Sequence, residues 1–293
     1  MTPVAVVIAT RNRAAGLDRT LHELAALPER PRVVVADNGS SDATAEVVAR
    51  HPGAELLPLG RNLGCGARTA GAWSVTEPYV AFSDDDSWWA PGALTRAVEI
   101  FERHPGLGLI AARVLVGPDE RLDPVCTEMA ASPLPGDGLP GPAVLGFVAC
   151  GAIVRRDAFL EVGGFETRFG IGGEEELLAL ELAAAGWGLA YVDEIVAHHH
   201  PSPSRDPARR RAVQTRNALW TAWLRRRVPG VIAVTTATAR GGLGDPAGRA
   251  GAIEAMRGLP WVLRERRPVG RGLEAAVRSL QQPRDVPAQT PST

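Results

Sequence analysis

Three consecutive aspartates, Asp84, Asp85 and Asp86, follow an apolar segment at residues 79–83. Carboxylates at the end of a buried strand repel one another unless a cation offsets their charge, and a pyrophosphate oxygen can complete the coordination of that cation. Acidic runs also occur in solvated turns and helix caps. The next residues, 87–91 (Ser-Trp-Trp-Ala-Pro), are untypical of a solvated turn. The pattern therefore favours a cation site enclosed by neighbouring side chains.

A second acidic run, Glu174-Glu175-Glu176, begins a segment at 174–185 with helical character. A carboxylate in such a place is suited to general-base chemistry. The helix dipole favours the ionised form there, whereas repulsion between neighbouring carboxylates raises their pKa values. The alternative is that these acids only stabilise the first turn of a helix.

Three histidines, His198, His199 and His200, follow an apolar strand predicted at 191–197. Side chains alternate along a strand, so His199 faces away from the other two, and one or two of the three can reach a cation. The alternative is a surface turn before Pro201.

Composition limits the chemistry further. The 293 residues are 45% hydrophobic and 22% charged, which is typical of a globular enzyme with one large domain or a domain and an appendage. All 32 basic residues are arginine, which excludes a Walker-type phosphate loop and Schiff-base catalysis. The three cysteines are too few and too scattered for a disulfide framework or a cysteine-based zinc site. With neither a signal peptide nor a membrane span in the pattern, a reducing cytoplasm is the expected location.

Apolar runs alternate with helical patterns through the first 90 residues. Strands are predicted at 4–9, 32–36, 55–58 and 79–83, and helices at 16–27, 42–50 and 67–76. This alternation predicts a doubly wound α/β sheet, in which ligands bind beyond the carboxyl ends of the strands. The polar clusters 10–13, 37–42 and 84–86 all fall at those ends.

The chain changes character after residue 116. Residues 117–143 are predicted to be irregular and 144–154 strand-like. Beyond residue 200 there are 17 arginines and 6 acids, against 15 arginines and 27 acids before it, so a basic tail follows an acidic body. An Arg-rich helix is predicted at 209–227 and a second basic helical stretch at 247–280.

Taken in order, several motifs resemble the family 2 inverting glycosyltransferases of the GT-A fold, over about residues 3–200. They are Ala-Thr-Arg-Asn-Arg at 9–13, Asp-Asn-Gly-Ser-Ser-Asp at 37–42, Arg-Asn-Leu-Gly at 61–64 with Arg68, Phe-Ser-Asp-Asp-Asp at 82–86, Gly-Gly-Phe-Glu at 163–166, Gly-Glu-Glu at 173–175 and the three histidines. The resemblance implies a mixed α/β sheet of this fold and a helical C-terminal extension.

The resemblance also implies a donor site. Its residues are Thr10 and Arg11 in the nucleotide pocket, Asp37 on the base, Arg68 beside the nucleotide and diphosphate with Asn62 shaping that loop, and Asp84 toward ribose or sugar; Asp85 belongs to the same donor set without a separate role. For Asp37 alone, an Asx-turn is an equally good explanation. The donor implied is a nucleotide-diphosphate sugar, most often a UDP-sugar.

Catalytic and metal roles follow in the same way. Glu175, beside Glu174, matches the position of the general base, where the family usually has Asp. Asp86 and His199 match the ligands of a divalent cation, Mg²⁺ or Mn²⁺. The segment Gly-Gly-Phe at 163–165 and Trp187 are expected on the acceptor side, and Trp88 and Trp89 are expected either to stack on a sugar or to belong to the core.

The expected organisation is a catalytic domain at 1–204, an Arg-rich helical extension at 205–280 and a disordered tail at 281–293. The helix at 209–227, with Trp220 and Trp223, is expected to pack its Trp face against the body; an in-plane helix on the inner face of an anionic membrane is the alternative. The acceptor stays open: a glycan, a lipid-linked sugar or a small molecule. Nothing indicates nucleic-acid binding. Rival functions are a sugar-1-phosphate nucleotidyltransferase and a non-catalytic nucleotide-sugar binding protein.

Overall fold

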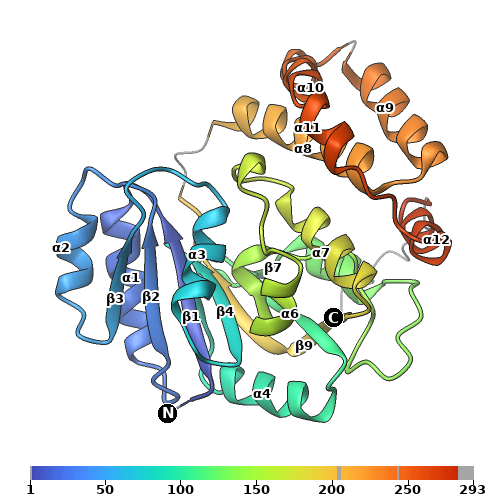
Figure 1. The fold of residues 1–293 in the computed structure, drawn as a ribbon. Helices are drawn as coiled ribbons and strands as arrows, with labels where there is room; N and C mark the ends of the chain where they lie inside the picture. Colours follow the sequence, from blue (N-terminus) through green and yellow to red (C-terminus); the bar gives the residue numbers. More distant parts are fainter. Residues whose placement is uncertain (1, 203–205, 243, 283–293) are drawn as a thin grey trace.

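The computed structural model describes residues 2–202, 206–242 and 244–282. A nine-stranded mixed sheet organises the first 200 residues, in the strand order β3-β2-β1-β4-β8-β6-β9-β5, with β7 beside β6 (Figure 1). The strands are β1 (Val4–Thr10), β2 (Arg32–Asp37), β3 (Ala54–Pro58), β4 (Tyr79–Asp84), β5 (Ser87–Trp89), β6 (Leu107–Val116), β7 (Arg121–Leu122), β8 (Ala152–Arg155) and β9 (Gly188–His199). The doubly wound mixed α/β sheet predicted from the sequence is confirmed.

Strand register brings the predicted polar clusters to one edge. Strands β3, β2, β1 and β4 are parallel, and the pairing sets Thr10 opposite Asp37 and Ala9 opposite Asp84. The carboxyl ends of these strands therefore meet at one level, as the sequence pattern predicts.

Both faces of the sheet are buried, which explains the continuous apolar runs. Along β1, Val4, Val6 and Ile8 pack on one face, whereas Ala5 and Val7 pack on the other. Helices α1 (Ala14–Ala25), α2 (Thr44–Ala49) and α4 (Ala93–Arg103) cover the first face; α3 (Gly66–Ser74), α5 (Pro124–Ala130), α6 (Arg156–Glu161) and α7 (Glu174–Ala184) cover the second.

Residues 117–155 depart from the sequence-based expectation. The stretch expected to be irregular contains β7 and α5, and α5 begins at an Asp-Pro cap, where the Asp123 carboxylate accepts the N–H of Val125 at 2.9 Å. The strand-like character predicted at 144–154 is wrong up to residue 151. A 3₁₀ turn, Ala149–Gly151, comes before β8, and its small residues let the backbone approach β6: a Cβ on Gly151 would lie 2.5 Å from the Val114 side chain.

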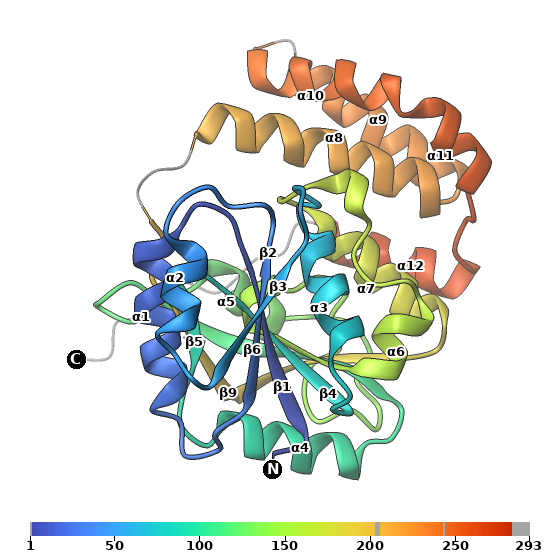
Figure 2. The ribbon, with the colours of Figure 1, turned by 60° about the vertical axis from the view of Figure 1, so that its left-hand side comes forward.

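The described chain beyond residue 205 is helical and lies across the carboxyl edge of the parallel strands (Figures 1 and 2). The helices are α8 (Pro207–Arg225), α9 (Val228–Gly242), α10 (Pro246–Arg257), α11 (Leu259–Glu265) and α12 (Arg271–Leu280). The sequence predicts one continuous stretch where α10, α11 and α12 form, and α9 is not predicted. The proposed boundary at residue 204 and most of the 281–293 tail lie outside the described residues.

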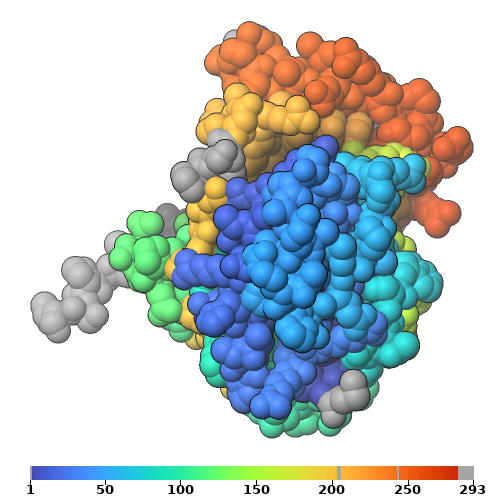
Figure 3. Space-filling view, turned by 90° about the vertical axis from the view of Figure 1, so that its left-hand side faces the viewer, coloured from blue at the N-terminus to red at the C-terminus, as the bar shows by residue number. Residues whose placement is uncertain are grey.

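The Trp face of α8 packs against the body. Leu219, Trp220 and Leu224 are buried in the same core as α7, and the ring of Trp220 lies 5.7 Å from that of Phe169. The packing predicted for this helix is confirmed, and the alternative, in which this face lies in a membrane, is wrong because the face is buried in protein. Figure 3 shows the C-terminal helices gathered at one end of the molecule. None of the helices in the described chain has the length and apolar character needed to cross a bilayer.

Candidate functional site

The ends of β1 and β2 form the expected nucleotide edge. Thr10 and Asp37 are both buried there, and Arg11 follows as an exposed residue. The Asp37 carboxylate accepts the backbone N–H of Ser40 at 3.0 Å and also the Ser40 hydroxyl. The Asx-type turn considered for Asp37 is therefore present, and it holds this carboxylate at the strand end.

The loop before α3 is organised by two asparagines. Asn62 accepts the N–H of Gly64 at 2.9 Å, which agrees with its predicted role of shaping this loop. Asn38, which the sequence analysis left without a role, is buried and bonds the loop twice. Its carbonyl oxygen accepts the N–H of Leu63 at 2.8 Å, and its amide donates to the carbonyl of Gly64. Asn38 therefore ties the end of β2 to the loop that leads to Arg68.

The three aspartates point to different partners. Asp85 accepts the hydroxyl of Thr10 at 2.9 Å and the Nε of Arg13 at 3.3 Å, so it fastens the acidic run to the loop after β1. Burial raises the pKa of Asp85 to about 6, and the neighbouring aspartates add to this effect. The approach is close: a Cβ on Gly16 would lie 2.9 Å from the carbonyl oxygen of Asp85.

Asp86 meets His199, as the sequence predicts for the two metal ligands. Their atoms Oδ1 and Nε2 are 3.3 Å apart, and β5 pairs with β9 so that Ser87 lies opposite His199. His198 and His200 lie on the other side of the strand, where both rings stand against Trp88 at 5.7 and 4.8 Å. The predicted alternation of the three histidines is confirmed.

The donor atoms at this point fit a hard divalent cation. Two neighbouring ligands of an octahedral Mg²⁺ or Mn²⁺ lie roughly 3 Å apart, which is close to the separation of the Asp86 and His199 atoms. Ligand atoms of Asp84, Cys150 and His199 also lie within 4.8 Å of one another. Burial raises the pKa of the Cys150 thiol, and a protonated thiol is a poor ligand. Carboxylates and one imidazole are thus the natural ligands here.

The protonation state of His199 depends on the groups that it contacts. Burial acts to lower its pKa, but hydrogen bonding to Asp86 and Cys150 outweighs this and raises the pKa of His199 to about 10. The pair is therefore an imidazolium and a carboxylate near neutral pH, and a cation that binds both displaces this proton. The sequence does not predict a place for Cys150 beside the imidazole, since the cysteines show no metal-binding spacing.

Arg68 joins the donor edge to the helix that carries the glutamates. Its side chain is only 3% exposed, and its guanidinium pairs with Asp84 at the end of β4. The same group lies 3.6 Å from a carboxylate oxygen of Glu174, at the start of α7. Phe165 supports it, with the guanidinium 5.6 Å from the ring centre. In this structure Arg68 is a buried link between two acidic groups.

Glu174 and Glu175 differ in environment. Glu174 is buried, and its carboxylate accepts the N–H of Gly172. Glu175 is half-buried, and burial, with the charge of Glu174 added, raises its pKa to about 8. A carboxylate with a pKa near neutrality is a stronger base than an ordinary one, as proton abstraction requires. Burial also raises the pKa of Glu176, which faces Arg226 instead.

A glycine loop in front of α7 is held by the C-terminal lobe. Gly170, Gly172 and Gly173 all have positive φ, between 71° and 123°, a conformation that favours glycine. Asn217 of α8 is fully buried, and its amide donates to the carbonyls of Phe169 at 2.9 Å and Gly172 at 2.7 Å. No sequence signal indicates this contact, because the partners are 45 and 48 residues apart.

The tryptophans are placed differently from some of the expectations. Trp89 is fully buried in the core and is not a sugar platform. Trp88 is nearly buried between the rings of His198 and His200 and the side chain of Arg19, whose guanidinium lies 4.8 Å from the Trp88 ring centre. Trp187 packs on Gly108 at the start of β6, at the opposite edge of the sheet, so the prediction that it lies on the acceptor side is wrong. Gly108 leaves room for the Trp187 side chain, which would lie 2.8 Å from a Cβ at position 108.

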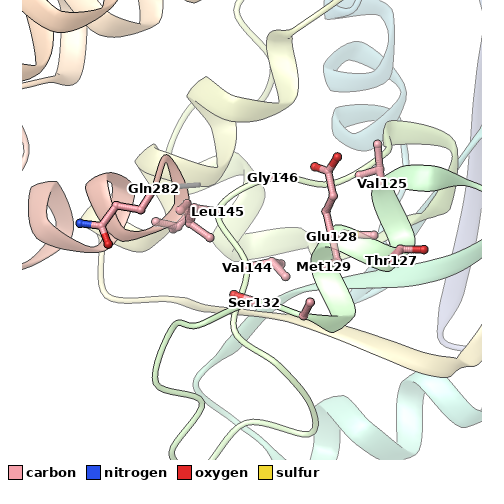
Figure 4. A pocket seen from close by; sticks show the side chains of 11 residues that line it. Val125, Thr127, Glu128, Met129, Ser132, Val144, Leu145, Gly146 and Gln282 are labelled. Atoms are coloured by element: carbon pink, nitrogen blue, oxygen red, sulfur yellow. The ribbon is translucent and has the colours of Figure 1, made fainter. Parts of the chain in front are cut away.

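Two cavities can be compared with this site, and the first borders it. One, of about 640 Å³, is lined by residues of the loop after β1 and α1, with Asp86, Trp88 and His200. It gives access to Asp86 beside the cation pair. The other, of about 430 Å³, lies between α5, residues 144–146 and the end of α12 (Figure 4). None of the site residues predicted from the sequence lines this second hollow.

The arrangement is matched by known proteins. The sequence model described as glycosyl transferase family 2 matches residues 5–163. The chain belongs to this family. It is 31% identical over 249 residues to the N-acetylglucosaminyl-diphospho-decaprenol L-rhamnosyltransferase of Mycobacterium tuberculosis, covering 71% of this chain and 80% of the relative. It is 30% identical to the pre-mycofactocin glycosyltransferase of the same organism, over 71% of this chain and 45% of that protein.

Solved structures agree on the fold. A mannosyltransferase from Pyrobaculum calidifontis, in complex with GDP-Man and Mn²⁺, superposes with a TM-score of 0.60 at 20% identity, covering 95% of this chain and 86% of that one. TarS from S. aureus (1–349), in complex with UDP-GlcNAc, gives a TM-score of 0.58 at 13% identity, covering 96% and 93%. The protein is a glycosyltransferase of the GT-A fold, and nucleotide-sugars are its donor class.

Proposed function

We propose that this glycosyltransferase inverts the anomeric centre, with Glu175 as general base and a divalent cation at Asp86 and His199. The Arg68 bridge is the observation that carries the proposal, since one buried guanidinium contacts both the donor-side Asp84 and the Glu174 beside the base. A donor at the carboxyl edge and an acceptor at α7 would therefore meet within one connected network.

The chemistry assigned to the chain is a single displacement. Glu175 takes the proton of an acceptor hydroxyl as that oxygen bonds to the anomeric carbon. The bond from this carbon to the nucleoside diphosphate breaks, and its electron pair stays on the diphosphate oxygen. Thr10, Arg11, Asp37, Asn62 and the Asp84–Asp85 pair are the residues we assign to the donor. A bound Mg²⁺ or Mn²⁺ would neutralise charge on the leaving group.

For the partners we propose a UDP-sugar donor and a lipid-linked sugar diphosphate as acceptor. The M. tuberculosis relative supports this acceptor class, since its name describes transfer to a decaprenol-linked N-acetylglucosaminyl diphosphate. We also propose peripheral contact with the inner face of a membrane, because a lipid-linked acceptor is anchored there. The rival functions considered from the sequence are not supported by the family to which the chain belongs.

The deciding experiment separates binding from transfer. UDP is titrated with and without Mn²⁺, and donor turnover is followed for the wild type and Glu175→Gln. We expect metal-dependent UDP binding in both proteins and loss of transfer in the variant, with an inverted anomer in the wild-type product by NMR. Full activity in Glu175→Gln would contradict the assignment of Glu175 as the general base. UDP binding unaffected by a chelator would contradict the role of a divalent cation.

A further inference from the structure

The outer side of α10 carries an exposed stripe of large apolar and basic residues. Ile253 and Met256 are 59% and 56% exposed, and Arg249 and Arg257 flank them. Arg249, Ile253 and Arg257 are four residues apart, and Met256 is three residues from Ile253, so they lie on one face of the helix. Single exposed apolar residues are ordinary, but two large ones between arginines on one face form an amphipathic pattern of their own.

The same spacing continues across Gly258 into α11. Leu263 is 68% exposed, and the side chain of Arg264 is 75% exposed. We name the six residues Arg249, Ile253, Met256, Arg257, Leu263 and Arg264 the outer stripe. Figure 2 shows α10 at the outside of the C-terminal lobe, above the carboxyl edge of the sheet.

One acid of these two helices faces inward, and a second lies at the border of the outer stripe. Glu254 pairs with Arg216 of α8 at 3.4 Å, whereas Glu265 pairs with Arg168 at 3.1 Å, next to the glycine loop, and also lies 3.5 Å from Arg264. The outer stripe therefore combines three apolar side chains with three cationic ones, and the Glu265 carboxylate offsets part of the charge of Arg264. Such a face complements a surface that is negatively charged and offers an apolar layer just beneath the charge.

We propose that the outer stripe docks the enzyme on an anionic lipid bilayer, with the apolar residues in the headgroup region and the arginines on acidic headgroups. This docking goes beyond the transfer reaction, although it fits the lipid-linked acceptor of the proposed function. It uses a different surface from the Trp face of α8, which is buried. Each arginine near an anionic bilayer strengthens binding about fivefold, and because Glu265 offsets the charge of Arg264, the stripe should prefer anionic over neutral lipid by about 25-fold.

The test is co-sedimentation of the full chain with vesicles, without donor. We expect binding to vesicles of phosphatidylglycerol and phosphatidylcholine, weakened by salt, and at least tenfold weaker binding to phosphatidylcholine alone. The variant Arg257→Gln/Arg264→Gln should lose the anionic preference, and Ile253→Ser/Met256→Ser should weaken binding about tenfold or more. Matched controls outside the stripe, Arg103→Gln and Trp73→Ser, should bind as the wild type does.

Several outcomes would overturn the docking. Equal binding to neutral and anionic vesicles, no binding to either, or unchanged binding by the stripe variants would each refute it. Loss of a dimer in the variants, seen by light scattering, would assign the stripe to self-association instead, and release from vesicles by a short oligonucleotide would assign it to nucleic acid. UDP titration of the same variants keeps this test separate from the proposed function, since their metal-dependent UDP binding should match that of the wild type.

Discussion

Asn217 offers the sharpest test of how the C-terminal lobe serves the base. Replacing it by Leu keeps the approximate shape and removes both hydrogen bonds to the glycine loop. The Phe169 carbonyl keeps Arg216 as a donor at 2.6 Å, whereas the Gly172 carbonyl loses its 2.7 Å partner. The substitution also removes the bond in which the Asn217 carbonyl oxygen accepts the Nε of Arg216 at 3.0 Å. Three bonds at about 1 kcal/mol each, with part of the penalty for an unpaired carbonyl, make a loss of about 3–5 kcal/mol.

This loss should appear in the chemical step more than in donor binding. Gly172 also donates to the carboxylate of Glu174, so a loosened loop displaces the start of α7, where Glu175 lies. A displacement of about 1 Å is enough to reduce turnover by about a hundredfold. We expect Asn217→Leu to lower kcat 10- to 100-fold, to lower Tm by several degrees, and to leave the Kd of UDP with Mn²⁺ within about twofold.

Thr221 provides the matched control. It lies one turn further along α8, is fully buried, and its hydroxyl has no hydrogen-bond partner among the described residues. Thr221→Val should therefore leave both kcat and Tm close to the wild type. If Asn217→Leu lowers Tm but keeps full kcat at a temperature where it is folded, Asn217 is only structural. A parallel loss of UDP affinity would also contradict the reasoning, because the lobe would then act on the donor edge.

Four further predictions concern the site itself. The rate should rise with pH through the raised pKa of Glu175, because only the ionised carboxylate can act as the base. Glu174→Gln removes a neighbouring charge and should shift the midpoint of the pH profile of kcat/KM to lower pH. An unchanged midpoint would show that a group other than Glu175 controls the profile. Because Glu175 titrates at about 8 when folded instead of its ordinary 4.5, its contribution to stability falls as pH rises between these values, which chemical denaturation at pH 5 and 8 can measure. His199→Ala should weaken UDP binding in Mn²⁺ but not in EDTA by calorimetry; equal weakening in both would exclude a metal role. Gly16→Ala should lower the unfolding free energy by about 1–3 kcal/mol in a denaturant titration, and an unchanged value would show that the loop relaxes freely around Asp85.

Local patterns were sufficient for the strands and for much of the donor edge. The runs that form β1, β2 and β4 are apolar because both faces of the sheet are covered, and parallel register then aligns Thr10 with Asp37. Alternation along β9 was also sufficient to separate His199 from its neighbours. These features depend on neighbouring residues in the chain, so local patterns reveal them: a continuous apolar run for the buried strands and a period of two for the histidines.

Features that depend on contacts between residues far apart in the chain could not be predicted from the sequence. Asn217 is an ordinary polar residue of an Arg-rich helix until α8 folds over the glycine loop. Cys150 enters the cation cluster only because a short 3₁₀ turn before β8 brings it beside β9. Trp187 looked like part of a sugar site because of its neighbours in the chain, yet its packing partner is Gly108. Each depends on a partner that no local pattern identifies.

The position of Arg68 explains why the base and the donor should act together. With no donor, its guanidinium is shared between Asp84 and the carboxylate of Glu174, and the two glutamates keep their mutual repulsion. If Asp84 turns to ribose or sugar when the donor binds, as we propose, more of the Arg68 charge is left for Glu174 and Glu175. A nearby positive charge favours the ionised carboxylate, so donor binding should lower the pKa of Glu175 and prepare the base at that moment. The midpoint in kcat, which reports the bound enzyme, should therefore lie below the midpoint in kcat/KM.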